Sequence, residues 1–293
     1  MQSFDYQKVH SLQEAFDAAL ASKGASVFMA GGTDLLVQIK EGKKRLQGII
    51  DVKGISEMDR VVLTGDEYSI GALTSIRTLE TSLPVSEKVP LLAQAAAKLG
   101  SVQVRNRATI GGNLCNASPS ADTASALLAL DAQVEIYGKT GTRVIELDRF
   151  FLGPGATVLG DGELLTRLKI PLTRNRQGSV YYKLSTRKAM DLAFVGVAVL
   201  IELGENDEII KTRIALGAVA PTPIRVPSAE RPLEGMRLRP EAARESAELA
   251  ARSCEPVSDH RASAEYRREM VRELCQQALW AAYRQAESQR EGT

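Results

Sequence analysis

Two pairs of adjacent glycines, far apart in the chain, constrain the fold most strongly. The first pair lies in V-F-M-A-G-G-T-D-L-L (Val27 to Leu36), and the second lies in A-T-I-G-G-N-L-C-N (Ala108 to Asn116). Each pair follows an apolar or β-branched run and precedes a helix-like stretch, so we expect a strand-to-helix turn at both places. Such turns offer backbone N–H groups to an anionic phosphate. Together they predict a ligand with two phosphates, bound between two lobes.

Length and charge narrow the class of protein. The 293 residues, 44% of them hydrophobic, suffice for two or three domains with real cores. Lys and Arg number 37 against 36 for Asp and Glu, which gives no basic field and argues against a nucleic-acid partner. No apolar run is long enough to span a bilayer, and the N-terminus lacks the pattern of a signal peptide. We therefore expect a cytoplasmic protein without a membrane span.

Cysteine and histidine are too few and too scattered to build a metal or disulfide site. Cys115, Cys254 and Cys275 show no Cys-x-x-Cys spacing, and only His10 and His260 accompany them. Cys115, between Leu114 and Asn116, is predicted to be a small packed residue. Demanding redox chemistry must then come from a bound organic cofactor or from a partner chain.

The periodicity predicts an α+β chain in three parts. Residues 1–57 suggest a small parallel βαβ unit, and residues 58–177 a mixed or antiparallel sheet with helices. Residues 178–293 suggest a three-stranded antiparallel sheet followed by a helical bundle. The connector is residues 171–178, which are polar and basic. The expected helices are Ser11–Leu20 (capped by Ser11), a short one at Leu35–Ile39, Pro90–Leu99, Thr123–Leu130, Pro240–Cys254 and Ala262–Ala286.

Four segments together resemble the FAD-binding medium subunit of the molybdenum hydroxylases, a family that includes xanthine dehydrogenase, carbon monoxide dehydrogenase and 4-hydroxybenzoyl-CoA reductase. The resemblance runs in the expected order to about Arg284. The segments are A-G-G-T-D-L-L (Ala30 to Leu36), Q-V-R-N-R-A-T-I-G-G-N-L-C-N-A-S-P-S-A-D (Gln103 to Asp122), Y-Y-K-L-S-T-R-K-A-M-D-L-A (Tyr181 to Ala193) and D-H-R-A-S-A-E-Y-R-R (Asp259 to Arg268).

The resemblance implies two FAD-binding lobes, 1–57 and 58–177, with the FAD diphosphate against both glycine turns. Glycines let the backbone approach closely, while threonine and asparagine side chains add hydrogen bonds. The first matching segment comprises Met29, Ala30, Gly31, Gly32, Thr33, Asp34 and Leu35. The second comprises Thr109, Ile110, Gly111, Gly112 and Asn113. We expect Gly111→Val or Gly32→Val to abolish flavin retention and leave a folded chain, because a side chain there would block the phosphate.

Further positions carry over from the family one at a time. Asp122 matches a residue along the FAD whose carboxylate can accept from ribityl or ribose hydroxyls. The others are Leu99 and Gly100 beside the adenine half, Leu165 against the isoalloxazine, Lys183 near the flavin, Tyr181 over the other ring face, and Asp191 in the adjoining loop.

The implied function is that of an electron-transfer flavoprotein subunit. In the family, a molybdopterin cofactor in a large subunit hydroxylates the substrate, and 2Fe-2S clusters in a small subunit pass the electrons to FAD. FAD then reduces NAD, a quinone, oxygen or another acceptor. The resemblance implies a dimer of heterotrimers, with no catalytic side chain and no metal in this chain. No cysteine lies between Cys115 and Cys254, so the extra cluster of the 4-hydroxybenzoyl-CoA reductase type is not expected.

Two other functions remain open at this point. One is a self-sufficient FAD oxidase or dehydrogenase of related fold, against which the two histidines, neither near a glycine turn, argue. The other is a non-enzymatic nucleotide-binding module that uses the same turns for a different phosphate ligand. A flavin spectrum of the purified protein would separate this nucleotide-binding module from the two flavoprotein functions, the electron-transfer subunit and the self-sufficient enzyme.

Overall fold

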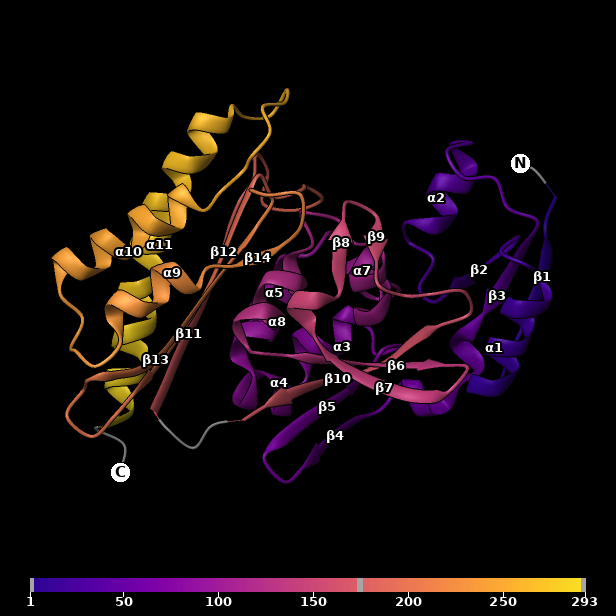
Figure 1. Cartoon of the computed structure of the whole chain (residues 1–293), viewed down its shortest axis with the longest axis horizontal. Coiled ribbons are helices and arrows are strands. Elements are labelled where there is room, and N and C mark those ends of the chain that lie inside the picture. Colours follow the sequence, from indigo (N-terminus) through magenta and orange to yellow (C-terminus); the bar gives the residue numbers. More distant parts are fainter. Residues whose placement is uncertain (1–2, 173–175, 291–293) are drawn as a thin grey trace.

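Three sheets follow one another along the long axis of the molecule, as Figure 1 shows. The computed structural model describes residues 3–172 and 176–290. Its mixture of one parallel sheet, antiparallel sheets and long C-terminal helices confirms the predicted α+β class. The boundaries predicted at residues 57 and 177 stay predictions, and residues 173–175 of the predicted connector lie outside the described residues.

The N-terminal sheet is parallel and has the strand order β1-β3-β2. Its strands are β1 (Asp5–Lys8), β2 (Ser26–Met29) and β3 (Gly48–Asp51), and its crossover helices are α1 (Leu12–Ala21) and α2 (Leu35–Lys40). Parallel neighbours need such crossovers. The predicted cap is confirmed, because Ser11 Oγ accepts a hydrogen bond from Glu14 N at 3.1 Å. Strand β2 ends at Met29, one residue before the first glycine pair begins, so the predicted strand-to-helix turn is present there.

The central sheet is antiparallel and has the order β4-β5-β10-β6-β7. Its strands are β4 (Val61–Thr64), β5 (Glu67–Gly71), β6 (Gln133–Gly138), β7 (Gly141–Glu146) and β10 (Leu164–Pro171). A two-stranded ribbon, β8 (Phe151–Gly153) with β9 (Ala156–Thr157), precedes β10. Between β5 and β6 the chain forms α3 (Ile76–Thr81), α4 (Leu83–Lys88), α5 (Pro90–Lys98), α6 (Val102–Arg105), α7 (Ile110–Cys115) and α8 (Asp122–Ala129).

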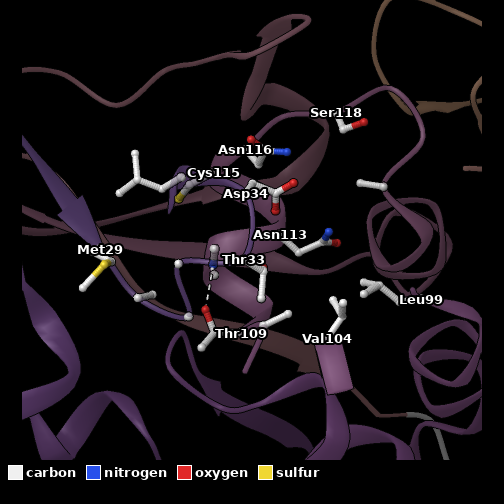
Figure 2. A pocket seen from close by; sticks show the side chains of 18 of the residues that line it. Met29, Thr33, Asp34, Leu99, Val104, Thr109, Asn113, Cys115, Asn116 and Ser118 are labelled. Carbon is white, nitrogen blue, oxygen red and sulfur yellow. Dashed lines mark hydrogen bonds between the residues drawn. The ribbon is translucent and has the colours of Figure 1, made fainter. Parts of the chain in front are cut away.

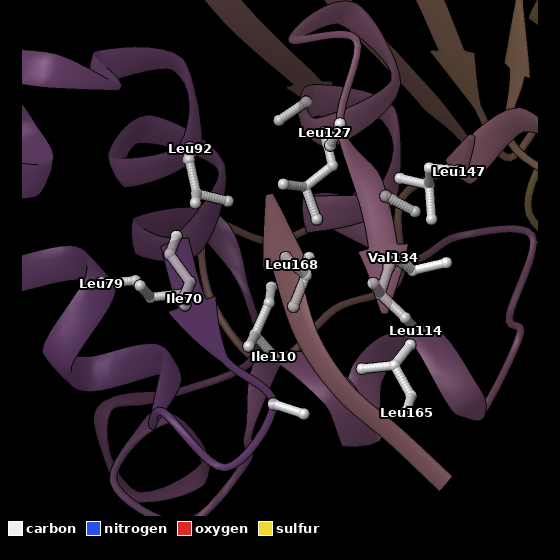
Figure 3. Packing of buried hydrophobic residues seen from close by; sticks show 14 of the residues in the cluster. Ile70, Leu79, Leu92, Ile110, Leu114, Leu127, Val134, Leu147, Leu165 and Leu168 are labelled. Atoms are coloured by element: carbon white, nitrogen blue, oxygen red, sulfur yellow. The ribbon is translucent and has the colours of Figure 1, made fainter. Parts of the chain in front are cut away.

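The core of this region joins the sheet to the helices. Figure 3 shows Ile70 and Leu168 of the sheet close to Ile110 of α7. Leu92 of α5 and Leu127 of α8 belong to the same cluster, and all five side chains are completely buried. Each buried side chain of this size contributes roughly 1.5–3 kcal/mol of hydrophobic stabilisation. This burial fixes the helices that carry the second glycine pair.

The prediction of a strand before the second glycine pair is wrong. Helix α6 precedes it, and Gly111 and Gly112 lie in the first turn of α7. Thr109 has extended backbone angles, but it forms only an isolated bridge with Ser75 and serves as the N-cap of α7. Its Oγ1 accepts a hydrogen bond from Gly112 N at 3.1 Å. A β-branched residue favours extended angles, and here a single capping residue accounts for the apparent strand.

The C-terminal sheet lies between two layers of helices (Figure 1). Its order is β11-β12-β13-β14, with strands β11 (Arg176–Leu184), β12 (Val195–Leu203), β13 (Ile209–Gly217) and β14 (Ile224–Arg225). Val197 and Val199 of β12 pack in one core with the C-terminal helices, while Ala198 and Leu200 pack in the other core with α5 and α8. Strand β12 is therefore buried on both faces and joins the two cores.

Three strands were predicted for this sheet, and the structure adds β14. This strand has two residues and lies among prolines, so no alternating pattern announces it. The helices beyond it are α9 (Pro227–Glu230), α10 (Pro240–Arg252) and α11 (Ala264–Glu287). None of the helices in the described ranges combines the length and apolar character needed to cross a bilayer.

Candidate functional site

A cleft of about 490 Å³ opens where the two glycine segments meet. Figure 2 shows Thr33 and Asp34 near Asn113 in this cleft, with Leu99 and Val104 on a further wall. Most of the residues predicted from the sequence line it. They are Met29, Ala30, Gly31, Gly32, Thr33, Asp34, Leu35, Leu99, Gly100, Thr109, Gly111, Gly112, Asn113, Asp122, Leu165 and Asp191.

Three predicted residues do not line the cleft. Ile110 is completely buried in the core beneath the sheet. Tyr181 is also buried, and its hydroxyl donates to Asp122 Oδ1 at 2.7 Å. Lys183 Nζ donates to Asp122 Oδ2 at 2.8 Å and to the carbonyl of Lys98 at 3.0 Å. Tyr181 and Lys183 therefore hold the cleft residue Asp122 from behind instead of facing the cleft themselves.

The first glycine turn presents backbone donors. Gly32 has φ +73°, a conformation that glycine adopts without steric cost. Within the described chain, the backbone N–H groups of Gly32, Thr33 and Asp34 have no hydrogen-bond acceptor. Burial raises the pKa of Asp34, and a hydrogen bond from Thr33 offsets part of that rise. Because this carboxyl group ionises less readily, it repels an anion bound beside the turn less strongly.

Lys53 supports this turn from the short 3-10 turn that follows β3. Its Nζ lies 2.7 Å from Asp51 Oδ1 and 3.2 Å from the carbonyl oxygen of Ala30. Asp51 is opposite Met29 in the parallel register, so the ion pair stands beside the end of β2. Tyr6 donates to the other carboxylate oxygen of Asp51. Lys53 thus fixes the backbone just before Gly31 and places a positive charge next to it.

The glycines have different physical tasks. A Cβ on Gly31 would lie 2.0 Å from the carbonyl oxygen of Arg107, and one on Gly111 would lie 2.6 Å from Ala72 Cβ. These two glycines permit close packing of backbone on backbone. A Cβ on Gly112 would instead lie 2.9 Å from Thr109 Oγ1 and 3.9 Å from Ala30 Cβ, between the two turns. The prediction that a side chain at Gly111 only blocks phosphate is therefore wrong, because the position has no room for one.

Side chains around the second turn are oriented by neighbours. Thr123 donates to Asn113 Oδ1 at 2.6 Å, which leaves the amide NH₂ of Asn113 as a donor. Burial raises the pKa of Asp122, and the nearby Lys183 charge offsets part of the rise. Each carboxylate oxygen of Asp122 accepts one bond and keeps a further lone pair. The predicted contact of Asp122 with ribose or ribityl hydroxyls stays a prediction.

The C-terminal sheet contributes the rest of the wall. Met190, Asp191 and Leu192, between β11 and β12, line the cleft. Met190 N donates to the carbonyl of Gly100 at 3.1 Å, which ties this loop to the segment before α6. The backbone N–H of Arg187 donates to Asp191 at 2.8 Å and lowers the pKa of that carboxyl.

Several cleft residues were not predicted. Cys115 was expected to be packed, but its side chain is exposed to the cleft. The surrounding protein still shields it from bulk water and raises the pKa of the thiol to about 12, so it is protonated at neutral pH. Cys115 lies one helical turn beyond Gly111 and Gly112, and this spacing could have predicted that its side chain lines the cleft. Others are Lys44, Val104, Asn116, Ser118, Ser120, Met190 and Leu192.

Comparisons with known proteins agree with this geometry. A family model described as "FAD binding domain in molybdopterin dehydrogenase" matches residues 2–173, and "CO dehydrogenase flavoprotein C-terminal domain" matches residues 180–282. The carbon monoxide dehydrogenase medium chain of Hydrogenophaga pseudoflava is 34% identical over 281 residues, which cover 96% of this chain and 97% of that one. The xanthine dehydrogenase FAD-binding subunit of Escherichia coli O157:H7 is 31% identical over 280 residues, covering 94% and 96%.

A solved structure is equally similar. Carbon monoxide dehydrogenase from Hydrogenophaga pseudoflava lacking the Mo-pyranopterin moiety superimposes with a TM-score of 0.94 at 32% identity, covering 97% of this chain and 98% of that one. Fold and cleft thus define the flavoprotein subunit of an oxidoreductase. More narrowly, the chain belongs to the FAD-binding medium subunit family of the molybdenum hydroxylases, of the xanthine and carbon monoxide dehydrogenase type. The predicted family and the predicted FAD cofactor are confirmed.

Proposed function

We propose that the cleft holds FAD with its diphosphate between the turn at Gly32 to Asp34 and the start of α7 at Gly112. The observation that carries this proposal is the convergence of the two glycine segments on one cleft, with backbone N–H groups on the first turn that find no acceptor among the residues the structure describes. The volume, about 490 Å³, lies in the range of sites that enclose most of a small ligand. The residues present therefore fit a dinucleotide.

Each part of the wall has a distinct task in this proposal. The open N–H groups of the first turn and the amide NH₂ of Asn113 donate to phosphate oxygens. Lys53 holds the carbonyl of Ala30 and adds positive charge next to the first turn. Asp122 accepts from sugar or ribityl hydroxyls, and Leu165 supplies an apolar surface for the ring system.

Bound FAD would supply the electron-transfer chemistry, and the chain supplies binding, orientation and exclusion of water. In the part of the chain that the structure describes, no three His, Cys, Asp or Glu side chains gather to hold a metal ion. Leu99, Leu165 and Met190 give the cleft apolar walls. Asp122, fixed from behind by Lys183, keeps its remaining lone pairs in a constant direction.

We further propose that this chain works in a complex with two partners. Relatives that match over nearly their whole length are named medium chains or FAD-binding subunits of dehydrogenases. On that basis a small subunit with 2Fe-2S clusters would deliver electrons, and a large subunit with the molybdopterin cofactor would hydroxylate the substrate. The acceptor would be NAD, a quinone, oxygen or another carrier, and the assembly a dimer of heterotrimers.

Reconstitution tests the proposed function. The purified chain, incubated with FAD and passed through a desalting column, should keep about one FAD per chain and show a flavin absorption spectrum. Co-expression with the predicted partners should then allow substrate-dependent bleaching of that flavin. Bleaching by a small substrate without partners would favour a self-sufficient flavin enzyme. Failure to keep any flavin, with another nucleotide bound instead, would favour the non-enzymatic module.

A further inference from the structure

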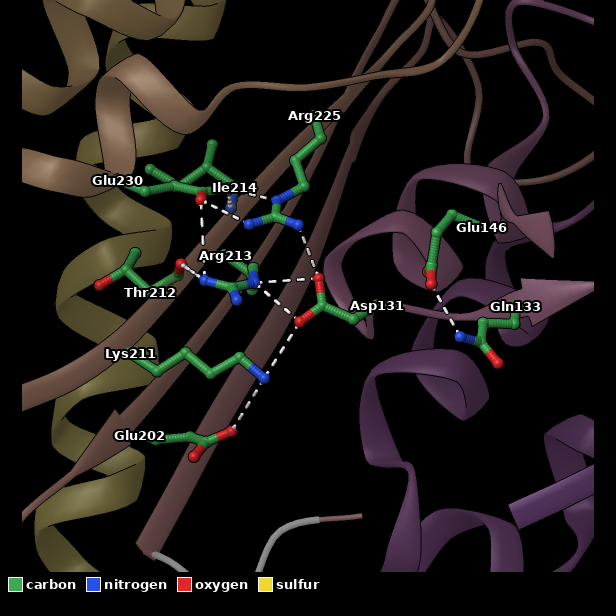
Figure 4. A network of polar contacts seen from close by, with 10 residues as sticks. All are labelled: Asp131, Gln133, Glu146, Glu202, Lys211, Thr212, Arg213, Ile214, Arg225 and Glu230. Carbon is green, nitrogen blue, oxygen red and sulfur yellow. Dashed lines mark hydrogen bonds and ion pairs between the residues drawn. The ribbon is translucent and has the colours of Figure 1, made fainter. Parts of the chain in front are cut away.

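A charge network connects the end of α8 to the C-terminal sheet (Figure 4). Asp131 Oδ1 accepts from Arg225 at 2.7 Å, and its Oδ2 lies 2.8 Å from Arg213 Nε and 3.0 Å from Lys211 Nζ. Arg225 also pairs with Glu230, which is almost completely buried and accepts from Ile214 N at 3.0 Å. Glu202 lies 3.6 Å from Lys211. One aspartate thus binds three cations of β13 and β14.

Asp131 takes an unusual backbone conformation to do so. Its φ is +50°, in the left-handed region that glycine, and less often asparagine or aspartate, adopts. The residue lies two positions beyond the end of α8 at Ala129, before β6 begins at Gln133. A glycine there would relieve the strain but would remove the carboxylate that contacts the C-terminal sheet. At this position the sequence therefore has an aspartate, whose carboxylate makes these contacts, in a backbone conformation that would suit glycine better.

The other end of α8 is tied to the same sheet. Asp122, the first residue of α8, binds Tyr181 and Lys183 of β11. Every residue of α8 is buried, and Ala198 and Ala215 of the C-terminal sheet belong to the core that contains it. Helix α8 is therefore held against the sheet by carboxylates at both ends and by apolar packing between them.

These contacts relate the network to the cleft. Asp122 at the near end lines the cleft, and β11 leads within a few residues into the loop of Met190 to Leu192, which lines it from the other side. Asp131 lies at the far end of the same helix and is not among the cleft residues. A shift of the sheet relative to α8 would move the loop relative to Asp122 and would change the bonds from Tyr181 and Lys183 that orient the Asp122 carboxylate.

We propose that Asp131 is a positioning residue for the FAD cleft. Through α8, its ion pairs with Lys211, Arg213 and Arg225 determine the positions of Asp122 and of the loop at residues 190–192. This inference rests on the proposed FAD site and adds a remote determinant to it. A long-range positioning effect of this kind changes ligand affinity by about 2- to 30-fold in other proteins.

The test compares Asp131→Asn with Glu248→Gln in the purified full-length chain. Glu248 of α10 is a matched control, because it also binds two arginines, Arg252 and Arg272, but only within the C-terminal helices. FAD is the probe for two quantities, its dissociation constant and the visible circular dichroism of the bound flavin. The third quantity is the melting temperature of the chain without FAD. If Asp131→Asn does not fold, Lys211→Gln, which removes one of the three cations, replaces it.

The proposal predicts that Asp131→Asn raises the dissociation constant of FAD about fivefold. The visible circular dichroism at saturating FAD should also change, since it reports the surroundings of the bound flavin. Glu248→Gln should lower the melting temperature without either effect. Unchanged flavin properties in Asp131→Asn, or equal changes in both variants, would overturn the inference. A wild-type chain that binds no FAD would overturn the proposed function itself, and this inference with it.

Discussion

At the scale of single residues, the glycines that look alike in sequence do different work. Gly31 and Gly111 allow backbone segments to touch, Gly32 supplies a positive φ, and Gly112 faces the space between the turns. Motif resemblance treats all four as phosphate contacts. Their surroundings show that only some of them can be tested through ligand binding without disturbing the fold.

Alanine at Gly111 and at Gly112 should therefore have opposite consequences. Gly111→Ala forces a Cβ against Ala72 and should lower the free energy of unfolding by about 1–3 kcal/mol. A Cβ in Gly112→Ala would lie 2.9 Å from Thr109 Oγ1, which must shift and so weakens its cap on α7, whereas alanine itself favours the helix. The stability of this variant should change little, while its FAD affinity falls about tenfold, or ~1.4 kcal/mol. Urea unfolding and FAD titration measure the two effects, and unchanged FAD affinity in Gly112→Ala would contradict the site.

Lys53 offers a second test at the residue scale. Lys53→Gln removes the ion pair with Asp51 and weakens the hold on the Ala30 carbonyl, so FAD affinity should fall several-fold. Lys43→Gln is the matched control, because Lys43 pairs with Glu41 at 2.7 Å but its side chain is 72% exposed. An exposed pair of that kind contributes little. Equal FAD affinities for the two variants, measured by fluorescence titration, would count against the role of Lys53.

At the scale of elements, the sequence predicts repeating patterns better than single positions. The helices at 12–21, 90–98 and 264–287 follow from apolar spacing and from the cap at Ser11, and the structure contains them within a few residues. The strand before Gly111 was wrong because one extended capping residue, Thr109, resembles the end of a strand. Strand β14 has only two residues and is held by its partner β13, which local sequence does not encode.

For the site as well, local motifs predicted some residues correctly, and contacts between residues distant in sequence could not be predicted. Backbone contacts at the glycine turns follow from local motifs, and most of those residues line the cleft. The roles of Tyr181 and Lys183 depend on a partner, Asp122, distant in sequence, so local sequence could not show that they turn toward it. Exposure of Cys115 depends equally on how α7 is rotated against its neighbours.

The attachment of helix α8 to the C-terminal sheet through Asp131 makes the stability of the chain depend on pH. Burial alone would raise the pKa of Asp131, but hydrogen bonds and charges of Arg213 and Lys211 outweigh it and hold the pKa below the ordinary 3.8. The stabilisation is then complete above that ordinary value and is lost as the pH falls through the lower pKa of the folded state.

Asp131→Asn should consequently be less stable than the wild type at neutral pH by about 1–2 kcal/mol. The difference should shrink as the pH falls below the ordinary value of 3.8. Urea unfolding at a series of pH values measures it. A stability difference that stays constant down to strongly acidic pH would show that the Asp131 carboxylate is not stabilised by its cations.

At the scale of the whole molecule, β12 contributes to two cores and so joins the FAD-binding part to the C-terminal helices. We expect the chain to unfold in one cooperative transition. FAD at a hundred times its dissociation constant should stabilise the whole chain by about 2.7 kcal/mol. Calorimetry with and without FAD checks this expectation. Two transitions, of which FAD shifts only one, would show that the C-terminal sheet unfolds independently of the cleft.

A crystal structure of the full chain grown with FAD would show where the cofactor binds. We expect density for the diphosphate between the backbone of Gly32 to Asp34 and that of Gly112, with the sugar hydroxyls within hydrogen-bonding distance of Asp122. Density for FAD elsewhere on the molecule, with ordered water alone between the two glycine segments, would contradict the account.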